Sequence, residues 1–179
     1  LLNFSKISRL GKRYLKVDMN SIMQGIIADL DFQIADKKAV ITIDPLPVIQ
    51  GIPLQMTQLF YNLMTNALKF SAPGRTPAIH ISSRLLSRKE LKQRLPADSP
   101  ATAYHEITVK DNGIGFKQEY AEQIFTIFQR LHDRSEYSGT GIGLSLCRKI
   151  VGHHNGKIYA ISKENEGATF HVLLPANQE

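Results

Sequence analysis

The stretch YHEITVKDNGIGF, residues 104–116, joins a run of alternating hydrophobicity to a turn that contains two glycines. Alternation with period two predicts a β-strand over 104–110, and the same alternation over 78–82 predicts its antiparallel partner. The segment between them, 85–101, is basic at first and then rich in Pro, Ser and Ala. We therefore expect an antiparallel pair joined by an extended hairpin connection.

The remaining segments predict how this pair is completed into a fold. The β-branched run 40–43 predicts another strand, and a second hairpin is predicted for 157–161 and 168–173 around the turn 164–167. Apolar periodicity and capping residues predict helices over 18–35, 53–70, 118–124 and 141–154. Because the strands come in hairpins without regular strand–helix–strand alternation, the sequence predicts an α+β fold. We expect a two-layer α/β sandwich whose mixed, mostly antiparallel sheet has helices packed on one face.

Composition limits the classes of protein to which the chain can belong. Its 179 residues are 42% hydrophobic and 21% charged, as in one soluble globular domain, and its single cysteine, Cys147, excludes an intramolecular disulfide. The net charge of +6 suggests an anionic partner. Residues 84–94 hold five basic residues and one acidic residue, so +4 of that charge lies in one stretch. We interpret this stretch as a solvated or partner-facing hairpin rather than a nucleic-acid surface.

Three polar residues form a column on the helix predicted over 53–70. Asn62, Asn66 and Lys69 stand at i, i+4 and i+7, beside an apolar stripe. One interpretation is the solvated edge of an amphipathic helix. The other is a metal–phosphate site, because amide oxygens can hold Mg²⁺ without repelling a triphosphate while a lysine offsets phosphate charge.

The turn Asp111-Asn-Gly-Ile-Gly-Phe116 directly follows a predicted strand. Asp-Asn-Gly is ordinary turn chemistry, but a turn does not need the second glycine two residues later. Paired glycines let the backbone approach a flat ligand closely, and a carboxylate at the strand end can accept a hydrogen bond from an exocyclic amine such as that of adenine.

A third motif, Gly139-Thr-Gly-Ile-Gly-Leu144, opens the helix predicted over 141–154. It matches neither the dinucleotide fingerprint nor the P-loop. Amides of a glycine-rich turn at a helix N-terminus can nevertheless bind phosphate oxygens. A flexible hinge is the alternative.

In this order the motifs Asn-x-x-x-Asn-Ala-x-Lys-Phe-Ser, Asp-Asn-Gly-Ile-Gly-Phe and Gly-Thr-Gly-Ile-Gly-Leu resemble the catalytic, ATP-binding domain of sensor histidine kinases, within the GHKL superfamily. Residues 124–131 are similar to the phenylalanine box of those kinases, and residues 2–7 look like the end of their helical dimerisation hairpin. The resemblance covers nearly the whole chain. It implies the Bergerat-type ATP-binding sandwich, with ATP and Mg²⁺ as cofactors.

The resemblance also implies a role for each matching residue. Asn62 and Asn66 correspond to the metal-side asparagines, Lys69 to a phosphate contact and Asp111 to the carboxylate that reads adenine. Gly113 and Gly115 shape that end of the pocket. The phosphate side is formed by Gly139, Thr140, Gly141, Gly143 and Leu144. Residues 130–138 are similar to the mobile lid, where Arg130 and Arg134 are either phosphate ligands or solvated loop charges; Phe125 and Phe128 are expected to pack and position this lid. Asn62, Lys69 and Arg130 are the expected catalytic set.

The resemblance implies transfer of the γ-phosphoryl group of ATP to a histidine on an adjoining helical domain. Two of the six histidines precede an acidic residue, and neither has an exposed helical context: in His105-Glu106 the histidine lies mid-strand, and in His132-Asp133 it lies in the lid. We therefore expect the phosphoacceptor upstream of Leu1. Residues 1–16 are then the end of the hairpin and a linker, 17–176 the catalytic domain and 177–179 a tail.

We expect a cytoplasmic fragment whose partners are its own phosphotransfer domain and the receiver domain of a response regulator, with no contact to nucleic acid or membrane. Two alternatives stay open. One is a different activity of the superfamily, a serine protein kinase or an ATPase clamp, although such ATPases resemble one another in having an acidic residue one turn before the metal-binding asparagine, where this chain has Asn62. The other is a non-catalytic interaction module.

Overall fold

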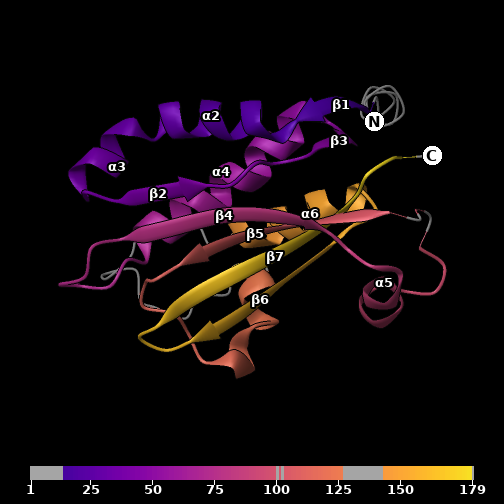
Figure 1. Cartoon of the computed structure of the whole chain (residues 1–179). Helices are drawn as coiled ribbons and strands as arrows, with labels where there is room; N and C mark the ends of the chain where they lie inside the picture. The colour runs from indigo at the N-terminus through magenta and orange to yellow at the C-terminus, as the bar shows by residue number, and fades with distance from the viewer. Residues whose placement is uncertain (1–13, 100, 102, 127–142, 179) are drawn as a thin grey trace, which may run out of the picture.

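A five-stranded sheet forms one layer of the molecule (Figure 1). The computed structural model describes residues 14–99, 101, 103–126 and 143–178. The strand order is β2-β4-β5-β7-β6, with β2 parallel to β4 and the other neighbours antiparallel. The strands are β2 (Val40–Ile43), β4 (Ala78–Leu85), β5 (Tyr104–Asp111), β6 (Lys157–Lys163) and β7 (Gly167–Pro175). The α+β sandwich with a mixed, mostly antiparallel sheet is confirmed.

The second layer is helical and covers one face of that sheet (Figure 1). It contains α2 (Met19–Asp29), α4 (Pro53–Lys69) and α6 (Gly143–His153), with α4 packed against both α2 and α6. A short helix, α3 (Asp31–Asp36), follows α2, and two 3₁₀ turns, η1 (Gln118–Tyr120) and η2 (Gln123–Phe125), occupy the stretch predicted as one short helix. The core between the layers is built from apolar side chains, which include Met23, Met56, Leu63, Ile107, Ile150 and Val172.

The starts of α2 and α4 follow the capping signals in the sequence. The Asp18 side chain accepts a hydrogen bond from the Asn20 N–H, and Pro53 occupies the first turn of α4. The helix predicted over 18–35 is instead interrupted at Leu30, a fully buried residue with φ −98° and ψ 9°. Neither Gly nor Pro marks this break, so periodicity alone extended the helix across it.

The residues just before α2 form a strand rather than the predicted linker. Strand β1 (Leu15–Asp18) pairs antiparallel with β3 (Val48–Gly51), in register from Leu15 opposite Gly51 to Asp18 opposite Val48. Val17 and Ile49 face each other and are buried in the core. Residues 15 and 16, which were expected at the end of a linker, are therefore paired with β3; residues 1–13 lie outside the described part of the chain.

The segment 85–101 contains a helix where an extended connection was predicted. Helix α5 (Arg88–Arg94) starts with a capping box, in which Ser87 and Glu90 each bond the backbone N–H of the other. Leu91 and Leu95 pack against a small cluster on the outer face of the sheet, Leu86, Tyr104 and Leu173. This contact separates α5 from the helical layer (Figure 1).

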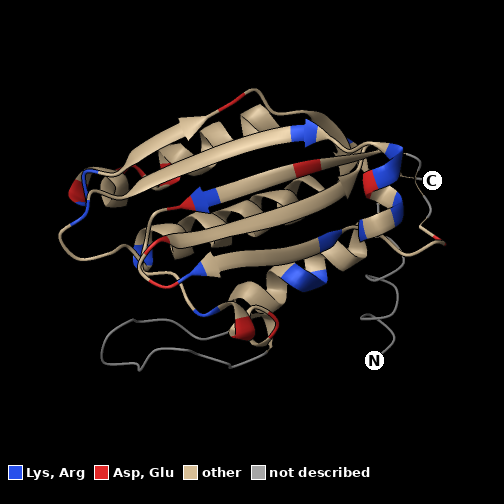
Figure 2. Cartoon of the chain, turned by 60° about the horizontal axis from the view of Figure 1, so that its bottom comes forward, with Lys and Arg blue, Asp and Glu red and all other residues tan. Residues whose placement is uncertain are grey.

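Helix α5 carries mostly basic residues, drawn in blue in Figure 2. The basic charge of this segment is partly neutralised by one buried acidic side chain. Glu106, 3% exposed, accepts hydrogen bonds from Arg84 (3.0 Å) and Arg94 (2.9 Å) through Oε2, while Oε1 lies 2.5 Å from Nδ1 of His171. Both arginines therefore hold α5 to the sheet, although Arg84 is also exposed to solvent. Arg88, Lys89 and Lys92 remain exposed.

Candidate functional site

The asparagine column lies on α4 where that helix meets the start of α6. Asn62, Asn66 and Lys69 are all half-buried. A methyl group added at Gly143, the first residue of α6, would lie 3.9 Å from Cγ of Asn62. The structure therefore brings the first motif together with the described end of the third.

Asn62 also lies beside Cys147, one turn further along α6. Burial raises the pKa of the Cys147 thiol to about 12, against the smaller opposing effect of a hydrogen bond with the Asn62 side chain. The thiol is fully buried and close to the carbonyl oxygen of Leu59. Cys147 is an apolar packing residue, as predicted, and not a nucleophile.

The Asp111 carboxylate is held by its Oδ1 atom alone among the described residues. Oδ1 accepts hydrogen bonds from the N–H of Gly113 (2.9 Å) and the N–H of Ala168 (3.2 Å). Desolvation by burial raises the pKa of Asp111, with these two hydrogen bonds opposing the rise. Since Oδ1 carries both bonds, Oδ2 is available to accept a hydrogen bond from a ligand.

Positions 113 and 115 of the second motif require glycine because neighbouring backbone atoms leave no room for a Cβ atom. A Cβ atom at Gly113 would lie 2.2 Å from the carbonyl oxygen of Phe70, and one at Gly115, where φ is +61°, would lie 2.2 Å from the carbonyl oxygen of Lys163. The N–H of Ile114 donates to the same Phe70 carbonyl (2.9 Å). The structure shows these glycines in close approach to protein backbone, and the contact with Phe70 joins the Asp111 turn to the end of α4.

Residues that the sequence did not single out complete this turn. Ser162 donates to the carbonyl of Gly167 (3.0 Å) and accepts from the N–H of Phe116 (2.9 Å). Asn112 accepts from the N–H of Ala78 (2.8 Å) and donates to the carbonyl of Thr76 (3.0 Å). The sequence contained one indication of this close contact, because the turn 164–167 ends in a glycine. Gly167 has φ +116°, and a Cβ atom there would lie 2.1 Å from the carbonyl oxygen of Asp111.

The predicted phosphate side is only partly within the described residues. Arg130, Arg134, Gly139, Thr140 and Gly141 lie outside them, as do Phe128 and His132. Leu144 packs against the core. Phe125 is buried, contacts Phe170 edge-on (6.2 Å between ring centroids) and lies under the Arg148 guanidinium (4.4 Å). Its predicted packing role is confirmed.

Lys69 lies at the end of the column, with its Nζ atom 5.0 Å from the centre of the Phe70 ring. In the described part of the chain, no three His, Cys, Asp or Glu side chains cluster in a way that could hold a metal ion. His105 lies within β5, where burial lowers its pKa.

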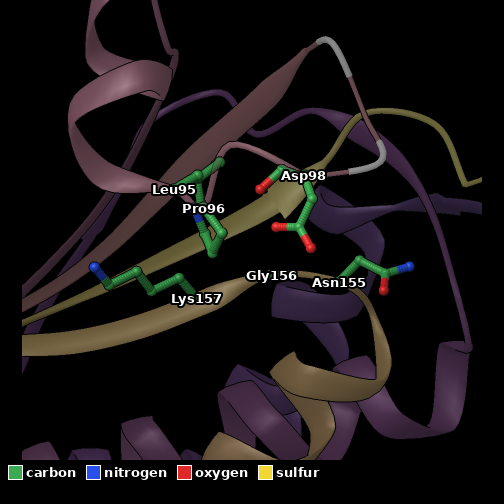
Figure 3. Close-up of a pocket in the computed structure, with 7 residues that line it drawn as sticks. Leu95, Pro96, Asp98, Asn155, Gly156 and Lys157 are labelled. Carbon is green, nitrogen blue, oxygen red and sulfur yellow. The ribbon is translucent and has the colours of Figure 1, made fainter.

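A separate cavity of about 450 Å³ lies between the end of α5 and the turn from α6 to β6 (Figure 3). It is lined by Leu95, Pro96, Asp98, Ser99, Asn155, Gly156 and Lys157. None of these residues belongs to the three motifs, so this cavity is not the predicted site.

In the part of the chain that the structure describes, no helix has the length and apolar character needed to cross a membrane.

Comparison with known proteins identifies the family to which these motifs belong. The family of "Histidine kinase-, DNA gyrase B-, and HSP90-like ATPase" domains matches residues 51–178. The chain is 37% identical over 175 residues to Cyanobacterial phytochrome A of Nostoc sp. (strain PCC 7120), an alignment that covers 98% of this chain and 21% of the phytochrome. It is 31% identical over 180 residues to the sensor protein kinase WalK of Staphylococcus saprophyticus, covering 98% of this chain and 27% of that kinase.

The fold has a close counterpart among solved structures. The catalytic domain of histidine kinase ThkA, in a nucleotide-free form, aligns with a TM-score of 0.71 at 22% identity, covering 92% of this chain and 97% of the ThkA domain. At this identity the structural likeness supports the fold alone, whereas the family match over residues 51–178 is a match of sequence. The chain belongs to the histidine kinase-, DNA gyrase B- and HSP90-like ATPase family.

Proposed function

We propose that this chain is the catalytic domain of a sensor histidine kinase, which binds ATP·Mg²⁺ and directs its γ-phosphoryl group toward a histidine on an adjoining helical domain. The observation that carries the proposal is the Asp111 carboxylate, whose Oδ1 atom is fixed by two N–H groups while Oδ2 faces no described partner. An adenine 6-amino group can donate to Oδ2. Family membership supports the nucleotide as ATP.

The phosphates are proposed to lie between α4 and the start of α6. Asn62 and Asn66 offer amide oxygens to Mg²⁺, and Lys69 offers positive charge, while Gly139, Thr140, Gly141, Gly143, Arg130 and Arg134 are candidate phosphate ligands. A bound Mg²⁺ would neutralise phosphate charge and orient the terminal phosphate. The column supports this assignment because all three side chains are half-buried on one edge of α4, and Asn62 lies beside Gly143.

The proposed transfer needs little covalent chemistry from this chain. The bond between the γ-phosphorus and the β–γ bridging oxygen breaks, a P–N bond to the imidazole forms, ADP leaves with the electron pair, and the imidazole proton passes to a base on the histidine's own domain. Positioning and charge stabilisation by Lys69, the asparagines and backbone amides are the contributions expected from this chain. Asn62 and Lys69, with Arg130, form the proposed catalytic set.

The wider context of the domain is also a proposal. The chain spans 21% to 27% of the length of the two relatives described above. We infer that residues 1–16 adjoin the helical hairpin, that 17–176 form the catalytic domain and 177–179 a tail, and that a receiver domain is the downstream partner. A cytoplasmic location agrees with the single buried cysteine.

The metal assignment is tested by the Mg²⁺ dependence of ATP binding. Calorimetric titration with ATP, in Mg²⁺ and in EDTA, is compared for wild type, Asn62→Ala and Asn66→Ala. Each substitution is expected to lower the gain in affinity due to Mg²⁺ by about tenfold, or ~1.4 kcal/mol, because an amide oxygen ligand is lost. Gln58→Ala, exposed on the same helix, is the control. Unchanged Mg²⁺ dependence in both asparagine variants would refute the assignment.

A further inference from the structure

Arg75, in the loop between α4 and β4, joins two segments that are far apart in sequence. Its Nη2 atom donates to the carbonyl oxygen of Gly113 (3.0 Å) and to the carbonyl oxygen of Asn165 (2.8 Å). Gly113 belongs to the turn after β5, and Asn165 to the turn between β6 and β7. One guanidinium therefore clamps the Asp111 turn to the β6–β7 turn.

The same two segments supply the hydrogen bonds that orient the Asp111 carboxylate. The N–H of Gly113 and the N–H of Ala168, three residues after Asn165, both donate to Oδ1 of Asp111. The N–H of Asn165 donates to the carbonyl of Ile114 (2.7 Å) and closes the same junction. Since the two donors come from different segments, the direction of Oδ2 depends on how these segments sit relative to one another.

Arg75 suits this task chemically. A guanidinium is planar and permanently charged, so it can hold two carbonyl oxygens at once with charge-assisted hydrogen bonds. Its side chain is exposed, and it bonds the turn from the side of the Gly113 carbonyl, whereas Asp111 takes the N–H of the same residue.

We infer that Arg75 is a positioning residue for purine recognition, which sets the orientation of the Asp111 carboxylate without touching the nucleotide. The inference rests on the proposed function, because it assumes that Oδ2 of Asp111 reads the 6-amino group of adenine. It predicts that loss of Arg75 lowers discrimination at that amino group more than it lowers binding of the phosphates.

The test compares two nucleotides that differ in the recognised group alone. ATP and purine riboside triphosphate, which lacks the 6-amino group, are titrated calorimetrically in Mg²⁺ into wild type, Arg75→Met and Arg75→Lys. Arg88→Met, an exposed arginine on α5, is the matched control. The preference of wild type for ATP is expected to fall about fivefold in Arg75→Met and by less in Arg75→Lys, with affinity for purine riboside triphosphate nearly unchanged.

The outcomes separate this inference from the function on which it rests. An unchanged preference for ATP in Arg75→Met overturns the inference while leaving the Asp111 assignment intact. An equal loss of affinity for both nucleotides also overturns it, because it shows a general structural effect. If wild type binds both nucleotides equally, the Asp111 assignment fails and the inference fails with it.

Discussion

The partly buried Asp111 carboxylate, proposed to recognise an amine, lowers the stability of the unliganded protein. Burial raises the pKa of Asp111, so the charged form is disfavoured in the folded state relative to the unfolded state. The charge therefore lowers stability at pH values above the folded-state pKa, and this loss is relieved as pH falls through that pKa. Packing alone gives no reason to keep such a charge, whereas accepting a hydrogen bond from a ligand does.

The cost of burying the Asp111 charge can be tested by the stability of the Asp111→Asn variant without nucleotide. At pH 7 this variant should unfold at or above the wild-type midpoint, because the amide oxygen can accept the Gly113 and Ala168 bonds without a buried charge. The difference should shrink as the pH is lowered, when the wild-type carboxyl becomes protonated. Thermal unfolding between pH 4 and 7 measures both trends. A variant clearly less stable than wild type at pH 7 would show that the charge is stabilising.

Residue types and spacings were sufficient to propose a candidate site, but not the residues that support it. Asn62, Asn66 and Asp111 could be proposed because each supplies a specific chemistry at a helix or strand position readable from the sequence. Arg75, Ser162 and the N–H of Ala168 could not, because they act through hydrogen bonds between segments distant in sequence. The reason for Gly113 and Gly115 was likewise hidden, since it lies in the carbonyls of Phe70 and Lys163.

At the scale of elements, a single buried histidine ties the two helices of the proposed site together. Nε2 of His154, at the end of α6, accepts a hydrogen bond from the N–H of Ile52 (3.0 Å), the N-cap of α4. Nδ1 of His154 lies 2.8 Å from the Ile150 carbonyl. These bonds require the neutral tautomer protonated at Nδ1. Tyr14 packs edge-on against the ring (5.6 Å) and donates to the carbonyl of His153 (2.8 Å).

The element-scale prediction is that His154→Ala destabilises the domain by about 3 kcal/mol. The substitution leaves the Ile52 N–H without its partner and opens a cavity at a fully buried position. Urea unfolding measures the loss, with the neighbouring His153→Ala as the control. A loss below about 1 kcal/mol would mean that α4 and α6 hold their relation without this contact.

Elements with local signals were predicted well, and those that depend on distant contacts were not. Strands β4, β5, β6 and β7 and helix α4 carry clear periodicity, and the structure confirms them. Helix α5 was not predicted, although Ser87-Arg-Lys-Glu90 is a capping-box sequence. Its seven residues are too few to show a helical periodicity of apolar side chains. Strand β1 carries almost no signal of its own, since it is defined by its pairing with β3.

For the whole molecule, the family match over residues 51–178 confirms the resemblance that the three motifs first suggested. Two layers bring the motifs together: α4 supplies the asparagines, the end of β5 supplies Asp111, and α6 begins beside Asn62. The outer face of the sheet, where α5 packs, lies apart from these motifs (Figure 1). The positive charge of residues 84–94 is therefore separate from the proposed triphosphate site.

The most direct test of the account is the affinity of the wild-type chain and of Asp111→Asn for ATP·Mg²⁺, measured by calorimetry, with Asp98→Asn at the distant cavity as the control. In Asp111→Asn the amide oxygen must accept the Gly113 and Ala168 bonds, so the NH₂ group would face the adenine amine, donor against donor. The account predicts that wild type and Asp98→Asn bind ATP alike, and that Asp111→Asn binds it about 30-fold or more weakly, ~2 kcal/mol. Equal affinity of Asp111→Asn and wild type would contradict it.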